Sequence, residues 1–158
     1  MLLYNPTKFL MIYGHNDFIL DGKTQSEVRT LFDNALTKIQ NFGITGADIM
    51  IGNCQTSSYF TTAPLQTLRD DYNAWLQTRQ QEEGFILLDI YTITVDPGDP
   101  QSINPLYDDG DGVHFNALGM EAIAAGAYHH IESPVNLLDG KVVITDGSDT
   151  PIGRWNEW

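Results

Sequence analysis

The chain has 158 residues, of which 42% are hydrophobic and 11% aromatic, a composition typical of one folded domain with a sizeable core. Its formal net charge is −13 and it has only eight Lys and Arg residues, which argues against a nucleic-acid partner because phosphate binding depends on those side chains. The same charge repels anionic lipid headgroups, and no apolar run is long enough to cross a bilayer, so we expect no membrane partner.

Short apolar runs alternate with amphipathic segments along the chain. Short, mainly apolar runs, which are typical of buried parallel strands, predict strands at residues 8–13, 47–51 and 85–90. Apolar side chains at helical spacing predict helices at residues 24–41, 64–83 and 116–131. The segment 96–112 is dense in Pro, Gly and Asp and predicts a long loop. Because strands and helices alternate, we predict an α/β fold with a parallel sheet and helices on both faces.

Residues 132–158 depart from this alternation. We therefore divide the chain into a domain at residues 1–131 and a C-terminal extension at residues 132–158. Within the extension, residues 141–145 predict a short strand. Trp155 and Trp158 end the chain, where such aromatic side chains either tuck into the domain or contribute to a partner surface.

Two polar runs stand at positions where α/β proteins bind ligands. The run Gly-His-Asn-Asp at residues 14–17 follows the first predicted strand directly. The run Asp-Gly-Val-His at residues 111–114 lies just before the last predicted helix. Ligands of parallel sheets bind beyond the carboxyl ends of the strands, so we expect both runs at one cleft.

In this order, the two runs resemble the third and fifth sequence blocks of the SGNH, or GDSL-type, hydrolase family. The resemblance covers about residues 8–131 and implies a three-layer α/β/α, flavodoxin-like fold. It also implies that Asn16 donates its side-chain amide to an oxyanion hole, that His114 is the general base, and that Asp111 orients His114. The spacing makes physical sense, because Asp and His three residues apart on a turn can face each other, and the carboxylate then fixes the imidazole tautomer.

The first run supplies two further candidates, Gly14 and His15, for substrate binding. Gly14 allows the backbone to turn sharply after the strand. His15 brings a titratable ring to the same edge of the sheet, where it either contacts substrate or bonds to the backbone of its own turn.

The family resemblance also points to something missing. Its nucleophilic serine lies in a Gly-Asp-Ser block upstream of both runs, yet only thirteen residues precede Gly14 and none of them is a serine. We therefore expect an N-terminally incomplete SGNH domain, whose serine comes from an upstream segment or from a second chain that completes the sheet. The strand at residues 8–13 would then be an open edge that invites pairing with another chain.

Three residues after the second strand are alternative nucleophiles. Ser57 and Ser58 could reach the catalytic edge of the sheet, but their loop is rich in Ser and Thr and is more simply interpreted as a solvated rim. Cys54 is more simply a small buried residue, and as the single cysteine it cannot form an internal disulfide. Secretion is therefore neither supported nor excluded.

A run of aspartates raises the possibility of a calcium site, because hard cations prefer carboxylate and carbonyl oxygens. These residues are Asp96, Asp99, Asp108, Asp109 and Asp111. Their spacing does not fit the EF-hand loop, and we predict a solvated acidic loop without a metal.

The resemblance favours hydrolysis of an ester on an acylated carbohydrate, because the Gly-His-Asn-Asp form of the third block is similar to that of polysaccharide O-acetylesterases in the family. The reaction would be acyl transfer through a serine acyl-enzyme, with His114 as base and then acid, and it implies no metal or organic cofactor. The competing hypothesis is a degenerate, non-catalytic SGNH domain that serves as a carbohydrate-binding or structural module, for example on a virion or cell surface.

Overall fold

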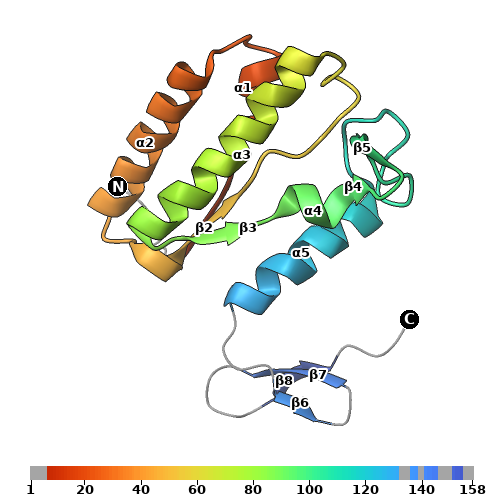
Figure 1. The fold of residues 1–158 in the computed structure, drawn as a ribbon. Helices are drawn as coiled ribbons and strands as arrows, with labels where there is room; N and C mark the ends of the chain where they lie inside the picture. Colours follow the sequence, from red (N-terminus) through yellow and green to blue (C-terminus); the bar gives the residue numbers. More distant parts are fainter. Residues whose placement is uncertain (1–6, 132–135, 139–140, 146–150, 155–158) are drawn as a thin grey trace.

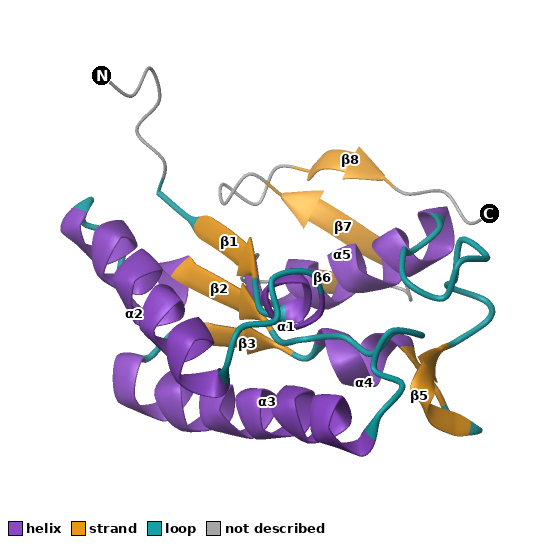
Figure 2. Ribbon diagram, turned by 90° about the horizontal axis from the view of Figure 1, so that it is seen from above, coloured by secondary structure: helices purple, strands orange, loops and turns teal. Residues whose placement is uncertain are grey.

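The computed structural model describes residues 7–131, 136–138, 141–145 and 151–154, and its centre is a three-stranded parallel sheet. The strands lie in the order β1 (Phe9–Ile12), β2 (Ile49–Gly52) and β3 (Ile86–Leu88). Met50 of β2 pairs with Leu10 on one side and with Ile86 on the other. The three predicted strands and their parallel direction are confirmed, and their carboxyl ends meet at one edge of the sheet (Figure 2).

Helices cover both faces of this sheet, as the alternating pattern predicted (Figures 1 and 2). One face packs against α2 (Gln25–Asn41) and α3 (Ala63–Glu83), which share the larger core cluster with it. The other face packs against α5 (Ala117–Ile131), where Leu88 belongs to the same cluster as Ile123. The fold is therefore the expected three-layer α/β/α arrangement.

Local signals explain where the helices begin and end. Thr24 and Glu27 form a capping box at the start of α2, in which the Glu27 carboxylate accepts the backbone N–H of Thr24 at 2.9 Å. Pro64 lies in the first turn of α3, and Gly84 ends that helix in the left-handed conformation. None of the helices in the described ranges has the length and apolar character needed to cross a membrane.

The region between β3 and α5 differs from the prediction in two ways. The strand predicted at residues 85–90 ends at Leu88, because the Asp89 side chain caps a short helix by accepting the backbone N–H of Thr92 at 3.1 Å. The segment predicted as a long loop begins instead with a short antiparallel pair. The added elements are α4 (Ile90–Thr94), β4 (Val95–Asp96) and β5 (Asp99–Ile103).

β1 is an exposed edge strand and not the buried strand that its apolar run predicted. Phe9, Leu10 and Ile12 are 37%, 49% and 48% exposed, whereas every residue of β2 is buried. Within the described part of the chain, no strand pairs with the outer edge of β1. The strand therefore has the side chains of a buried strand in an open position, as expected of an incomplete domain.

The described parts of the extension form a separate antiparallel sheet. Its strands are β6 (Asn136–Leu138), β7 (Lys141–Thr145) and β8 (Pro151–Arg154). β7 confirms the strand predicted at residues 141–145. Trp155 and Trp158 lie outside the described residues.

Candidate active site

The run at residues 14–17 turns the chain directly after β1. Gly14 has a φ of 110°, and a Cβ atom there would lie 2.8 Å from the ring of Tyr72, so both the backbone and the packing require glycine. The short helix α1 (His15–Ile19) begins at the next residue. The turn therefore presents His15 and Asn16 at the carboxyl end of β1.

The run at residues 111–114 forms a turn that is closed by its own aspartate. Asp111 Oδ2 lies 2.6 Å from His114 Nδ1, and Asp111 Oδ1 accepts the backbone N–H groups of Val113 and His114, each at 2.8 Å. The hydrogen bond to Asp111 raises the pKa of His114 above its usual 6.5, and the three hydrogen bonds lower the pKa of Asp111 to about 2. With Nδ1 held by the carboxylate, Nε2 is the nitrogen that can exchange a proton with a reactant.

Both runs line one cavity at the carboxyl end of the sheet. The cavity has a volume of about 350 Å³, and its lining includes His15, Asn16, Gln55 and His114. Burial lowers the pKa of His15 below its usual 6.5, and charge on the nearby His114 lowers it further. The cavity thus combines an amide donor with a carboxylate-bound imidazole, which are the groups that an acyl-transfer site needs beside its nucleophile.

No serine in the described ranges lines this cavity. Ser57 Oγ lies 2.8 Å from His15 Nε2, but Ser57 is only 1% exposed. Ser58 is exposed, and its hydroxyl donates to the backbone carbonyl of Asp111 at 3.4 Å. Cys54 lines the cavity, but burial raises the pKa of its thiol to about 12, so the reactive thiolate does not form near neutral pH. None of the three combines the exposure and the activation that a nucleophile needs.

The loop that carries these residues is the solvated rim that its composition predicted only in part, because Ser58, Thr61 and Thr62 are exposed but Thr56 and Ser57 are buried. Thr56 is fully buried beside Ser57, and the guanidinium of Arg69 donates to the Thr56 hydroxyl at 2.8 Å. Arg69 is itself 1% exposed and lies against the rings of Phe60 and Tyr91. Polar side chains are buried here because each finds a partner from a distant part of the chain.

Sequence reasoning missed the contact between His15 and Ser57. His15 was expected to touch substrate or its own backbone, but its side chain bonds to Asn16 and to Ser57, which is 42 positions away. No sequence pattern connects the two residues, because the loop between β2 and α3 had to fold back onto α1 to join them.

The aspartates proposed as an alternative calcium site bond mainly to their own turns. Asp108 Oδ1 accepts the backbone N–H groups of Gly110 and Gly112, and Asp99 accepts the backbone N–H of Gln101. Among the described residues, no three His, Cys, Asp or Glu side chains are grouped as metal ligands.

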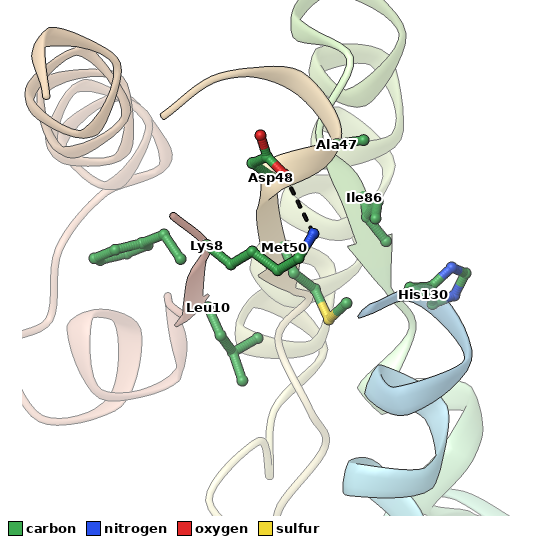
Figure 3. A pocket seen from close by; sticks show the side chains of 8 residues that line it. Lys8, Leu10, Ala47, Asp48, Met50, Ile86 and His130 are labelled. Atoms are coloured by element: carbon green, nitrogen blue, oxygen red, sulfur yellow. Dashed lines mark hydrogen bonds and ion pairs between the residues drawn. The ribbon is translucent and has the colours of Figure 1, made fainter. Parts of the chain in front are cut away.

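A second hollow, of about 140 Å³, lies at the opposite end of the sheet (Figure 3). Residues at the amino ends of the strands line it, among them Leu10 and Met50, and Lys8 and Asp48 form an ion pair beside it at 3.2 Å. Exposed His130 from the end of α5 completes the lining. This hollow is far from the strand ends where parallel sheets bind ligands, and it adjoins the exposed strand β1.

Comparisons with known proteins relate this arrangement to one family. The model of the GDSL-like lipase/acylhydrolase family matches residues 2–122. A GDSL-like lipase from Bacteroides thetaiotaomicron superposes with a TM-score of 0.65 at 15% identity, covering 78% of this chain and 61% of that one. A member of the lipolytic G-D-S-L family from Veillonella parvula gives a TM-score of 0.56 at 19% identity, covering 78% of this chain and 63% of that one. The chain therefore spans less than two thirds of either structure. No match was found among curated protein sequences.

Proposed function

Because the chain belongs to the GDSL-like lipase/acylhydrolase family, we propose that it is the part of a serine esterase that carries the general base and the oxyanion donor. The observation that carries the proposal is the 2.6 Å contact between Asp111 and His114 beside the cavity that Asn16 also lines. His114 Nε2 takes the proton of a serine hydroxyl as the serine oxygen attacks the ester carbonyl, and the Asn16 amide donates to the oxyanion. His114 then protonates the leaving alcohol and activates the water that releases the acid.

The serine comes from a segment outside the 158 residues, either upstream in a longer polypeptide or on a second chain. The exposed apolar side chains and unpaired outer edge of β1 support this proposal, because they match a missing neighbouring strand. A strand added there in parallel would end at the same edge as β1, beside Gly14. The residue that follows such a strand would then reach the cavity.

The proposed substrate is a short-chain ester, such as an acetyl group, on a carbohydrate. A cavity of about 350 Å³ lies at the small end of ligand sites and suits a short acyl group better than a long chain. The net charge of −13 favours a neutral polymer over an anionic one. The similarity of the Gly-His-Asn-Asp run to that of polysaccharide O-acetylesterases also supports this substrate.

The test is reconstitution. The purified chain alone should hydrolyse p-nitrophenyl acetate at background rates, because loss of a triad nucleophile costs about a million-fold in kcat. A segment from the same coding region that carries Gly-Asp-Ser after a strand should restore turnover of p-nitrophenyl acetate and acetylated xylan. His114→Ala should then abolish turnover, whereas His130→Ala, at the opposite end of the sheet, should leave it unchanged. Robust turnover by the chain alone, lost in Ser57→Ala, would contradict the proposal.

A second candidate function is a non-catalytic module that binds carbohydrate or supports an assembly. The absence of serine from the lining of the cavity, within the described ranges, favours it. It predicts binding to acetylated xylan by calorimetry without turnover in the presence of any serine-bearing segment. In that case His114→Ala should leave turnover at background and alter only the affinity.

A further inference from the structure

Asn16 is joined to His15 and Ser57 by two consecutive hydrogen bonds. His15 Nδ1 lies 3.1 Å from Asn16 Oδ1, and His15 Nε2 lies 2.8 Å from Ser57 Oγ. Ser57 Oγ also accepts the backbone N–H of Tyr59 at 3.3 Å. The His15 ring packs edge-on against Phe60, with ring centroids 5.5 Å apart. Both nitrogens of the imidazole are engaged, and the ring has little freedom to turn.

The partners of His15 determine which ring nitrogen carries the proton. The buried Ser57 hydroxyl already accepts the backbone N–H of Tyr59, and among the described residues its own hydrogen has no acceptor other than His15 Nε2. Nε2 is therefore the unprotonated nitrogen, and Nδ1 carries the hydrogen that is donated to Asn16 Oδ1. Burial lowers the pKa of His15 below its usual 6.5, so the ring is neutral at pH 7 and Nε2 has a lone pair. That lone pair accepts the hydroxyl hydrogen of Ser57. Donation therefore runs in one direction, from Ser57 to His15 to Asn16.

We propose that this relay fixes the orientation of the Asn16 side-chain amide, which makes His15 and Ser57 positioning residues for the oxyanion donor. A side-chain amide has two orientations that differ by a flip about its last torsion. In the flipped orientation, Asn16 Nδ2 would face the Nδ1–H of His15, and two donors would meet without an acceptor. The relay holds the carbonyl on His15 and leaves the Nδ2 hydrogens to donate into the cavity that Asn16 lines.

The inference rests on the proposed role of Asn16, and it explains why an exposed amide needs a buried support. Asn16 is exposed, so water competes for both ends of its amide. Ser57 is shielded from water, so water does not compete for its hydrogen bond to His15. That bond keeps one donor and one acceptor nitrogen on the His15 ring, and the ring in turn orients the exposed amide of Asn16.

The same geometry disfavours Ser57 as a nucleophile. Ser57 is 1% exposed and is not among the residues that line the cavity, so a substrate carbonyl could reach its hydroxyl only if neighbouring side chains moved. The backbone N–H of Ser58 donates to the carbonyl of Gly112 at 2.7 Å and is not available to an oxyanion. A positioning role accounts for the contact between His15 and Ser57 without requiring access.

Nuclear magnetic resonance of the 158-residue chain at pH 7 tests the relay directly. Long-range ¹H–¹⁵N correlations should identify the Nδ1–H tautomer of His15. Ser57→Ala removes the hydrogen bond from Ser57 to His15, and His15→Phe removes both hydrogen bonds of the ring. One net hydrogen bond shifts the equilibrium between the two amide orientations by about fivefold. The Asn16 side-chain amide resonances should therefore move toward those of a freely rotating Asn. His15→Gln retains one donor and one acceptor and should restore them. Thr61→Ala removes an exposed hydroxyl of the same loop and should leave them unchanged.

An Nε2–H tautomer, or Asn16 resonances in Ser57→Ala and His15→Phe identical to those of the wild type, would overturn the relay. These measurements do not depend on esterase activity. A chain that shows the relay but has no esterase activity with any segment would therefore contradict the proposed function and leave the relay intact. In a reconstituted esterase, Ser57→Ala should lower kcat about fivefold with KM unchanged. Asn16→Ala should lower it about 10²- to 10³-fold. A loss in Ser57→Ala as large as that in His114→Ala would identify Ser57 as the nucleophile and overturn the positioning role.

Discussion

The two loops that flank the cavity are both polar in sequence, yet they are held in opposite ways. The loop at residues 108–114 is largely exposed, and Asp108 and Asp111 bond within the loop, as Asp111 does to His114 three residues later. The loop at residues 53–60 is largely buried, and its side chains bond to distant residues such as Arg69. A self-contained turn can keep its geometry when its surroundings change, whereas a loop held by long-range contacts depends on the whole fold.

Among the tests of this contrast between the two loops, removal of the Arg69 side chain should have the largest effect on stability. Arg69→Ala should lower the free energy of unfolding by about 3 kcal/mol, because it leaves a void and removes the contacts with Phe60 and Tyr91. Urea unfolding measures the loss. In the same variant, the backbone N–H of Ser58 should exchange faster with solvent, while the pKa of His114 stays raised. A fall in the pKa of His114 would show that the two loops are not independent.

Asp70→Asn is the matched control for this experiment. Asp70 bonds to the Arg69 guanidinium at 2.8 Å, but its side chain is 58% exposed. The Asp70 carboxylate is largely in solvent but the guanidinium is buried, so Asp70→Asn removes a counter-charge while keeping an oxygen that can accept from Arg69. The control should therefore lose less stability than Arg69→Ala. If both variants lost the same stability, the ion pair and not the buried packing would hold the loop.

Gly112 is one of the points where the two loops touch, and its substitution should have the next largest effect. Its φ is 73°, and a Cβ atom there would lie 2.8 Å from both Cβ and Oγ of Ser58. Gly112→Ala should destabilise the protein by about 1–3 kcal/mol. Gly110→Ala shares the positive φ but meets no atom within 4 Å, so it should cost less. Ser58→Gly should relieve part of the cost of Gly112→Ala in the double variant, and additive costs would argue against the steric contact.

The smallest expected effect concerns the pair Asp111 and His114. Asp111→Asn should lower the pKa of His114 toward 6.5, because the charged partner that raises it is gone. Titration of the His114 ring by nuclear magnetic resonance measures this shift. Asp109→Asn is the control, because Asp109 raises the same pKa through a weaker, longer-range interaction. An unchanged pKa in Asp111→Asn would contradict the assigned contact.

The pKa shifts of Asp111 and His114 also predict how the stability of the protein depends on pH. The raised pKa of His114 contributes stability that is present below 6.5 and is lost as pH rises through the folded-state value. The lowered pKa of Asp111 contributes stability that is present above 3.8 and is lost as pH falls toward about 2. The difference in stability between the wild type and Asp111→Asn should therefore be greatest between pH 3.8 and 6.5.

Much of the fold could be predicted from the sequence because its signals are local. Apolar runs located β1, β2 and β3, and helical spacing located α2, α3 and α5. The predictions were wrong where local signals competed. The predicted strand extends to residue 90, but Asp89 caps a helix there and β3 ends at Leu88.

The candidate site likewise has one contact that could be predicted from local sequence and others that could not. The contact between Asp111 and His114 could be predicted, because a short turn brings the two side chains together whatever surrounds it. The burial of Thr56 and the bond from Ser57 to His15 could not, because they exist only where a loop folds back onto α1 and α3. Composition alone makes such a Ser- and Thr-rich loop look solvated.

By itself, the sequence determined the order of the three central strands and the helices α2, α3 and α5, the turn at Gly14 and the Asp-x-x-His turn, since each depends on residues that are neighbours in the chain. Only the tertiary structure decided that the loop at residues 53–60 is largely buried and that His15 orients toward Asn16 and Ser57. Burial and long-range hydrogen bonds depend on which segments meet. They stabilise the fold by excluding water between groups that lie far apart in the sequence.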